Sequence, residues 1–308
     1  MNNTLLNKIW QVYTNVEEWK AYYKIKKISE MLEWIKYTNY KFPYKYYKNK
    51  ILLDMGCGWG LHSILFSLQG AKEIYALGPD DRVEFFKDLA KNTPKSEKIH
   101  VKKMFFDLES EKLIDNKIDI IICNEFIEHL TSEQQIAFFN VSYENLNPNG
   151  LLIMHTHNTD NIKVLQKIKL HWSRQEDNIY IKKRREIIFK EFPKFNDEEI
   201  INLANSSYGM NYQGILKLCE GYKKTGVIYN PNYRLCAVDP VNGIPDENYI
   251  SPQIIKNEME HAGYRTRIKQ YTGYQFPQKY ISIILNEFPL SIRYLTKSVT
   301  FWGRKEDW

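Results

Sequence analysis

The segment LDMGCGWG, Leu53 to Gly60, constrains the fold of this chain more than any other stretch. It joins an apolar run that ends at Asp54 to LHSILFSLQG, an apolar helical pattern that stops at Gly70. Glycines in such a turn let the backbone bend tightly, and they let a ligand approach the bare main chain at a helix N-terminus. The pattern predicts a strand, a ligand-binding glycine turn and a helix.

Strands and helices continue to alternate after this turn. The apolar runs EIYALG, HVKKMFF, IDIIICN and LLIMHTHN predict further strands, with helical patterns between them. Nearly continuous apolar strands separated by helices indicate a parallel sheet that is covered on both faces. YRTRIKQY and SVTFWGRK are expected to close the sheet. The predicted fold class is therefore α/β, with a doubly wound sheet.

Two segments do not follow this alternation. Residues 1–48 have large apolar residues at helical spacing and predict an N-terminal helical cap. Residues 159–249 contain basic amphipathic helices followed by a loop-rich stretch, and they predict a lid or substrate-binding insertion after the fifth strand. The sheet core is expected in residues 49–158 and 250–308.

Composition narrows the class of protein. The net charge of +6 is spread over lysines along the chain, which favours a solvated surface over a nucleic-acid site. The four cysteines form no CxxC pair, which is typical of a reducing compartment, so a cytoplasmic location is expected. No apolar run has the length of a membrane span, so no membrane partner is expected. The oligomeric state cannot be read from the sequence.

The ordered motifs resemble those of the class I S-adenosylmethionine-dependent methyltransferases. The resemblance covers roughly residues 49–158 and 250–305, and it implies a Rossmann-like sheet, mostly parallel with an antiparallel last strand. LDMGCGWG resembles the first motif of the family, FFDLES its adenine-contacting segment and IDIIICNEFIEHL its fourth strand. The resemblance implies S-adenosylmethionine as cofactor. It also implies binding roles for the methionine end (Asp54, Gly56, Gly58), for the adenine (Asp107, Leu108) and for the site at strand four (Asn124).

The second strand departs from the family pattern. An acid that binds the ribose hydroxyls usually ends this strand, but Gly78 stands there in ALGPDD. Asp80 is the nearest substitute, and it can equally be the N-cap of the helix that follows. The sequence leaves both roles open.

After the fourth strand the chain reads E-x-x-E-H, at Glu125, Glu128 and His129. On one helical turn these side chains would share a face and could bind a divalent ion such as Mg²⁺. The E-x-x-E-H pattern resembles that of a ubiquinone-biosynthesis O-methyltransferase-like branch of the family. It also resembles that of RNA 2′-O-methyltransferases that bind a metal. A role in capping or in lining the pocket is an equally good interpretation.

His155 and His157 end the fifth strand and point the same way by strand alternation. A histidine at this edge can take the proton from an acceptor hydroxyl. His129, His155 and His157 are the candidates for this catalytic base, and the sequence does not rank them.

The first functional hypothesis is an enzyme that O-methylates a small molecule, such as a sugar or sugar nucleotide in bacterial surface-glycan or secondary metabolism. Tyrosines of the insertion suit such an acceptor (Tyr208, Tyr212, Tyr229, Tyr233). The alternatives are a metal-dependent RNA 2′-O-methyltransferase and a non-catalytic cofactor-binding regulator. The basic helices favour the former, and Gly78 alone favours the latter.

Overall fold

The structure is a computed structural model that describes residues 3–108, 110, 112–229, 236–248, 251–271 and 296–306. The chain divides into two compact units. Unit 1 comprises Met1–Ile127, Ser132–His157 and Pro252–Trp308, and unit 2 comprises Glu128–Thr131 and Asn158–Ser251. Each unit is described by itself.

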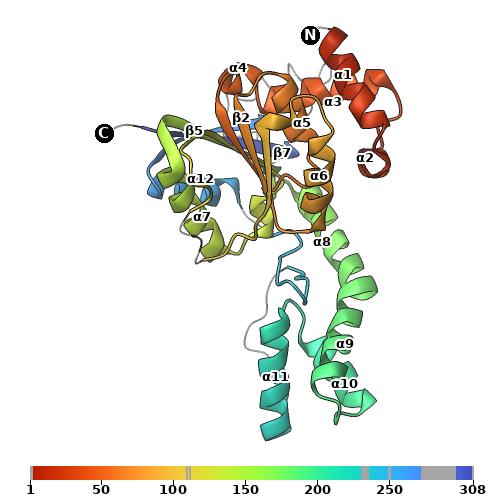
Figure 1. Ribbon diagram of the computed structural model, residues 1–308. Helices are drawn as coiled ribbons and strands as arrows, with labels where there is room; N and C mark the ends of the chain where they lie inside the picture. Colours follow the sequence, from red (N-terminus) through yellow and green to blue (C-terminus); the bar gives the residue numbers. More distant parts are fainter. Residues whose placement is uncertain are drawn as a thin grey trace. The chain divides into compact units, whose positions relative to one another are not determined.

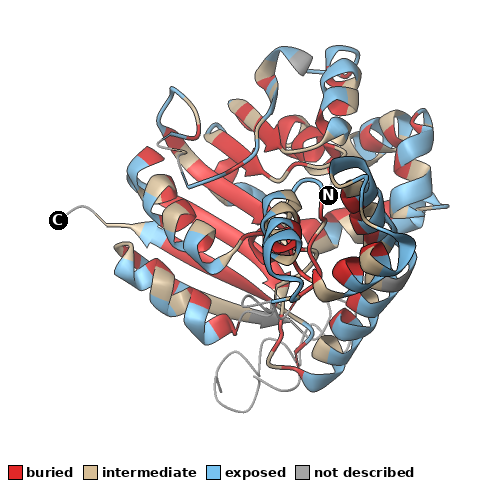
Figure 2. Cartoon of the chain, turned by 90° about the horizontal axis from the view of Figure 1, so that it is seen from below, coloured by how far each residue is buried: buried red, intermediate tan, exposed pale blue. Residues whose placement is uncertain are grey.

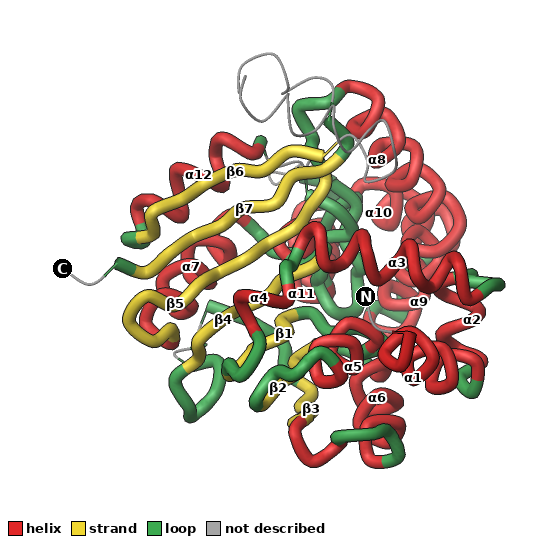
Figure 3. Tube along the Cα trace, turned by 90° about the horizontal axis from the view of Figure 1, so that it is seen from above, coloured by secondary structure: helices red, strands yellow, loops and turns green. Residues whose placement is uncertain are grey.

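Unit 1 is built on a seven-stranded sheet with the order β3-β2-β1-β4-β5-β7-β6, which Figure 3 shows from above. The strands β1 to β5 run parallel to one another, and β7 is antiparallel to both β5 and β6. The predicted α/β fold, mostly parallel with an antiparallel last strand, is confirmed. The strands are β1 (Ile51–Met55), β2 (Glu73–Gly78), β3 (Ile99–Lys103), β4 (Ile118–Asn124), β5 (Leu146–His157), β6 (Tyr264–Tyr271) and β7 (Ser298–Lys305).

Helices cover both faces of this sheet. In Figure 1, α7 and α12 lie on one side of the strands, and α5 and α6 lie on the other. The helix α1 packs against α3 and α5, so the N-terminal helices belong to the second of these layers. The helices of unit 1 are α1 (Asn3–Thr14), α2 (Glu17–Tyr23), α3 (Ile28–Lys41), α4 (Tyr44–Tyr47), α5 (Leu61–Leu68), α6 (Asp81–Lys91), α7 (Ser132–Asn145) and α12 (Pro252–His261), with a short 3-10 helix, η1 (Ser96–Lys98).

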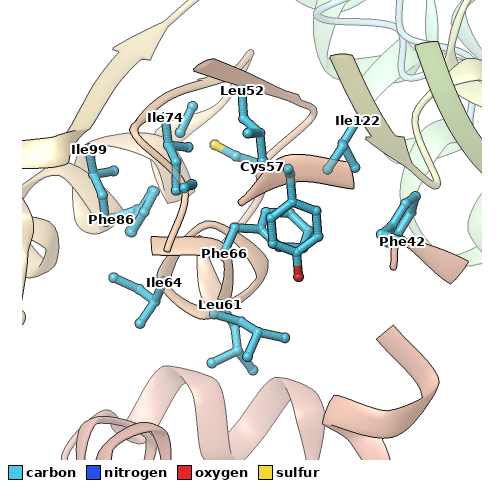
Figure 4. Close-up of a cluster of buried hydrophobic side chains, with 14 of the residues drawn as sticks. Phe42, Leu52, Cys57, Leu61, Ile64, Phe66, Ile74, Phe86, Ile99 and Ile122 are labelled. Carbon is cyan, nitrogen blue, oxygen red and sulfur yellow. The ribbon is translucent and has the colours of Figure 1, made fainter. Parts of the chain in front are cut away.

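The main apolar core lies between the N-terminal helices and the sheet. Figure 2 shows the strands as buried and the outer helix faces as exposed. Phe42, Phe66 and Phe86 come from three different helical segments and are fully buried. Figure 4 shows how these rings meet side chains of the strands and of the glycine turn (Leu52, Ile74, Ile99, Ile122, Cys57). The turn is therefore embedded in the core.

Unit 2 is helical and has apolar clusters of its own. One of them joins α9, α10 and α11 through Ile188, Leu203 and Cys219. Arg184 is 1% exposed, forms an ion pair with Glu176 and donates from Nε to the carbonyl oxygen of Ala204 at 2.9 Å. The helices are α8 (Ile162–Gln175), the π-helix η3 (Glu176–Tyr180), α9 (Ile181–Glu191), α10 (Asp197–Ser206) and α11 (Tyr212–Thr225), and a 3-10 turn, η2 (Ile127–His129), enters from unit 1.

All four cysteines are buried free thiols. Within the described part of the chain, no helix combines the length and the apolar character that a membrane span requires.

The limits of two strands differ from the sequence expectation. β3 ends at Lys103, although HVKKMFF predicted a strand to Phe106. β5 begins at Leu146 because the NPNG segment is included in the strand, and Leu146 pairs with Ile118 before a register shift. A register shift between Ile118 and Ile120 accommodates the extra residues, so the expected turn does not break the strand.

Gly60 tests how tightly the glycine turn is packed. Its φ is +81°, and a Cβ there would lie 2.2 Å from Cδ2 of Phe86. We expect Gly60→Ala to lower the free energy of unfolding by about 2–4 kcal/mol through backbone strain and overpacking.

Gly58→Ala is the matched control, because Gly58 also has a positive φ but a Cβ there would meet no described heavy atom within 4 Å. Urea denaturation of both variants measures the difference. Equal losses of stability would contradict the packing explanation.

Candidate active site

The glycine turn is tied to the end of the neighbouring strand. The backbone amides of Gly56 and Cys57 both donate to the carbonyl oxygen of Leu77, at 2.8 and 2.9 Å. Gly60 is in the left-handed conformation and directly precedes α5. A Cβ on Gly58 would meet no described heavy atom within 4 Å, so the space beside this residue is open. The turn thus presents bare backbone to an open volume at a helix N-terminus, as predicted.

Asp54 stands at the end of β1, immediately before the turn. The residue is 2% exposed, and its Oδ2 accepts a hydrogen bond from Oγ of Ser63 at 2.5 Å. Burial raises the pKa of Asp54 to about 6, and the Ser63 hydrogen bond opposes this rise because it favours the charged form. A buried carboxylate with one hydroxyl donor is suited to a cationic ligand group.

Aromatic residues of α2 lie over the same turn. Trp19 is fully buried, and its Nε1 donates to the carbonyl oxygen of Trp59 at 2.7 Å. The ring of Tyr22 lies 6.4 Å from the ring of Trp59, which also contacts Phe85 edge-on at 5.3 Å. The sequence indicated that the N-terminal helices form a cap, but it did not identify Trp19 as a residue that holds the turn.

Gly78 has a packing explanation. A Cβ at this position would lie 2.6 Å from Cγ2 of Val83, so no acid fits without displacing that side chain. Asp80 caps α6, since its Oδ1 accepts from the backbone N–H of Arg82 at 3.0 Å. Its carboxylate also pairs with the guanidinium of Arg82. The capping role is therefore present in the structure, and the ribose role remains a prediction.

The proposed adenine-contacting residues follow β3. Asp107 and Leu108 are both exposed, and Leu108 is 62% exposed. The Asp107 carboxylate accepts a hydrogen bond from Oγ of Ser110 at 2.9 Å. Glu109, which belongs to the FFDLES motif, lies outside the described residues, as does Tyr233 of the insertion.

Asn124 ends β4, and its side chain has a partner that the sequence did not reveal. Its Oδ1 accepts from Nζ of Lys41 at 2.7 Å. Lys41 is the last residue of α3 and is 4% exposed. The only sequence signal was its spacing, because Lys41 continues the buried stripe formed by Met31, Ile35 and Thr38.

His155 lies on β5 directly beside Asn124 in register. Its Nδ1 is 2.9 Å from Oγ1 of Thr300, and its Nε2 is 3.5 Å from the hydroxyl of Tyr37. Burial and the nearby Lys41 hold the pKa of His155 well below its usual range, so the ring is neutral at neutral pH. Two residues further on, His157 is half-buried at the strand end.

The E-x-x-E-H residues do not form one helical turn. Glu125 precedes the 3-10 turn Ile127–His129 and has a φ of +54°. It belongs to unit 1, whereas Glu128 and His129 belong to unit 2. Among the residues that the structure describes, no group of three or more His, Cys, Asp or Glu side chains is arranged to hold a metal ion.

Glu128 and His129 are bound to the loop that follows α11. The backbone amide of Asn248 donates to the carbonyl oxygen of Glu128 at 2.7 Å. Nδ1 of the half-buried His129 lies 3.1 Å from the carbonyl oxygen of Pro245. Because a carbonyl oxygen can only accept, Nδ1 carries a proton in this contact, which leaves Nε2 as the ring nitrogen that could accept one.

The insertion contains a cavity of about 720 Å³ along α11. This volume is within the usual range for small-molecule pockets. Its lining includes Tyr229, one of the tyrosines selected from the sequence, together with Asn211, Lys217, Tyr222 and Thr225.

The comparison with known protein families identifies the family of this chain. A family model described as "Methyltransferase domain" matches residues 19–193, which is more than half of the 308 residues. The chain therefore belongs to the methyltransferase domain family, and it is an S-adenosylmethionine-dependent methyltransferase. No match was found among curated proteins.

Solved structures of methyltransferases are similar at low identity. A SAM-dependent methyltransferase from Archaeoglobus fulgidus is 13% identical, with 90% of this chain and 92% of that chain covered and a TM-score of 0.46. A putative sarcosine dimethylglycine methyltransferase from Galdieria sulphuraria is 14% identical, with 91% and 89% covered and a TM-score of 0.47. The assignment rests on the family model.

The residues present fit the cofactor. The buried carboxylate of Asp54 suits the α-ammonium group of S-adenosylmethionine, and the open space at Gly58 suits a ligand that lies against the main chain. The acid that would bind the ribose is absent at Gly78.

Asp54 is expected to make cofactor binding depend on pH. Its pKa is raised, so the charged form that an ammonium group requires is lost as the pH falls through about 6. The affinity for S-adenosylhomocysteine, measured by calorimetry from pH 5 to 8, should therefore decrease below pH 6. Ser63→Ala should move this decrease to higher pH, because it removes the hydrogen bond that favours the charged form.

Asp54→Asn is the control for this prediction. It should weaken binding about 10–100-fold at pH 8, as expected for a lost charged hydrogen bond, and should abolish the pH dependence. Wild-type binding that is flat between pH 5 and 8 would contradict the role of Asp54.

Asp80→Ser and Asp80→Ala separate the two roles of Asp80. Serine keeps a capping oxygen but no charge, and alanine keeps neither. Because the carboxylate is engaged by Arg82, we expect both variants to bind S-adenosylhomocysteine like the wild type, and only Asp80→Ala to lose about 1 kcal/mol of stability. A tenfold weaker affinity in Asp80→Ser would instead support the ribose role.

Proposed function

We propose that this enzyme transfers the methyl group to a hydroxyl oxygen of a small molecule, such as a sugar or sugar nucleotide of bacterial surface-glycan or secondary metabolism. The observation that carries the proposal is the hydrogen bond of His129. Its Nδ1 donates to the carbonyl oxygen of Pro245, so its Nε2 can accept a proton. O-methylation requires such a base because the acceptor hydroxyl loses its proton. The ligand-sized cavity of the insertion supports a small acceptor.

The bound cofactor supplies an electrophilic methyl group on its sulfonium. Asp54, Gly56 and Gly58 would hold its methionine end, Asp107 and the backbone of Leu108 its adenine, and Asn124 would line the site. The insertion, residues 159–249, would supply the acceptor site. The acceptor proton would pass to Nε2 of His129 and then to water. These roles follow the motif resemblance and the local geometry described above.

We favour His129 over the other two candidate histidines. Both ring nitrogens of His155 face a hydroxyl, and the depressed pKa of this ring makes it a weak base. His157 is half-buried at the end of β5 and stays the second choice.

The RNA alternative loses part of its support in the basic helix α9. Arg184 is buried against Glu176, and Lys183 pairs with Asp239 at 2.9 Å. Two of the basic residues in this helix therefore serve the packing of the insertion. The regulator alternative rested on Gly78, which the packing against Val83 explains.

The proposed acceptor class is tested by incubation with methyl-labelled S-adenosylmethionine and fractionated pools of sugar nucleotides and small RNAs. We expect label in the small-molecule fraction, with little effect of salt. Label confined to RNA, with a rate that falls steeply with salt, would support the RNA alternative.

His129→Asn tests the base within the same assay. The asparagine amide can replace the Nδ1 donor to Pro245, but the variant lacks the proton-accepting Nε2. We expect about a 10²–10⁴-fold lower kcat with unchanged affinity for S-adenosylhomocysteine. Turnover close to that of the wild type would exclude His129 as the base.

A loss of turnover on exhaustive chelation that Mg²⁺ restores would instead favour the metal hypothesis for Glu125, Glu128 and His129.

A further inference from the structure

Lys41 is a buried cation at the carboxyl ends of the central strands. It is 4% exposed, and its Nζ donates to Oδ1 of Asn124 at 2.7 Å. The same Nζ lies 4.6 Å from the ring centroid of Tyr37 and 5.5 Å from that of Phe42. A lysine is rarely buried to this extent unless it is paired.

Within the part of the chain that the structure describes, no anionic partner is in contact with this ammonium group. Among the described residues, no carboxylate oxygen lies within 4.0 Å of Nζ of Lys41. The charged and titratable groups around it are the exposed Glu125 after β4, His62 on α5, His155 on β5 and Tyr37 on α3 itself. Of these, only Glu125 attracts the positive charge.

The two neighbouring histidines supply no negative charge to compensate the positive charge of Lys41. The pKa of His62 is lowered to about 3 and that of His155 lies well below its usual range, in both cases through burial first and Lys41 second. The pKa of Lys41 itself is lowered to about 8 by burial, against the pull of Glu125. Lys41 is therefore a buried positive charge whose desolvation the described residues leave largely uncompensated.

The position of Lys41 across the sheet indicates which ligand it serves. Asp54 lies near the end of β1 and the glycine turn follows that strand, whereas Lys41 is bound to the end of β4, one strand further, and His155 lies on β5 beyond that. The proposed methionine-binding residue, Asp54, and the partner of the lysine, Asn124, thus lie on the neighbouring strands β1 and β4, and β4 is on the side of β1 away from β2.

We propose that Lys41 binds a negatively charged oxygen group of the methyl acceptor, a carboxylate or phosphate, so that the acceptor is an anion held beside Asn124 and His155. The inference rests on the proposed function only in naming the ligand as the acceptor. An oxyanion would supply the missing counter-charge and accept the remaining N–H groups of Lys41, and an aromatic carboxylate would also match the rings of Tyr37 and Phe42.

The test uses benzoate and inorganic phosphate as probes, added to protein saturated with S-adenosylhomocysteine. In protein labelled with ¹³C at lysine Cε, the Lys41 signal is identified by its absence in Lys41→Met. We expect this signal to titrate near pH 8, and a saturating probe to raise the midpoint by at least one unit. Lys41→Met should weaken binding of the effective probe at least tenfold.

Lys45→Met is the matched control. Lys45 also lies over a tyrosine ring, 4.9 Å from the centroid of Tyr46, but it is exposed. This control should bind the probe within twofold of the wild type. Thermal unfolding checks that each variant folds, and methionine at position 41 should be tolerated because it removes a buried charge.

Three results would overturn the proposal. The first is equal probe affinity in the wild type and Lys41→Met, and the second is a Lys41 midpoint that the probes do not move. The third is evidence that Lys41 binds the carboxylate of the cofactor instead of an anionic group of the acceptor. If Lys41→Met weakens S-adenosylhomocysteine at least tenfold but leaves 5′-methylthioadenosine unchanged, Lys41 serves the cofactor and not the acceptor.

The measurements are independent of turnover. A failure to methylate any small molecule would therefore contradict the proposed function, while the probe titrations would still decide the role of Lys41.

Discussion

The turn between β1 and α5 depends on one shared acceptor, the carbonyl oxygen of Leu77. Two successive amides, those of Gly56 and Cys57, donate to it, and this fixes the path of the chain as it leaves the central strand. A side chain at Gly60 would meet Phe86, so the turn and the core must form together. The position of the Asp54 carboxylate follows from this turn.

Much of the fold could be predicted because its central strands, β1, β4 and most of β5, are buried on both faces. Such strands read as continuous apolar runs, and the limits of β4, β6 and β7 match the sequence expectation. The predicted strand limits were wrong where the local sequence favours a turn but the backbone still pairs with the neighbouring strand. NPNG has the composition of a turn, but its residues lie within β5, since a register shift allows Leu146 to pair with Ile118. Pairing partners of this kind are not visible in one strand alone.

The candidate site was only partly predictable, for a related reason. A motif such as LDMGCGWG carries its chemistry in adjacent residues, so the positions of Asp54 and Gly58 could be inferred directly. Lys41 lies 83 positions before its partner Asn124, in a helix whose other lysine, Lys36, is exposed. The absence of an acid at Gly78 was visible in the sequence, but its cause was not, because Val83 fills that space only in three dimensions.

The two buried charges of unit 1 are governed by the same physics with opposite sign. Burial raises the pKa of Asp54 to about 6 and lowers that of Lys41 to about 8, so each shift favours the neutral form. Neither charge has an ion-pair partner within 4.0 Å among the described residues. Replacement of either by an apolar residue would remove a desolvation cost from the free protein. In the free protein the charges of Asp54 and Lys41 are therefore destabilising. Binding of a ligand with complementary charges would offset this desolvation cost. This behaviour is expected of residues in a binding site and not of residues in a core.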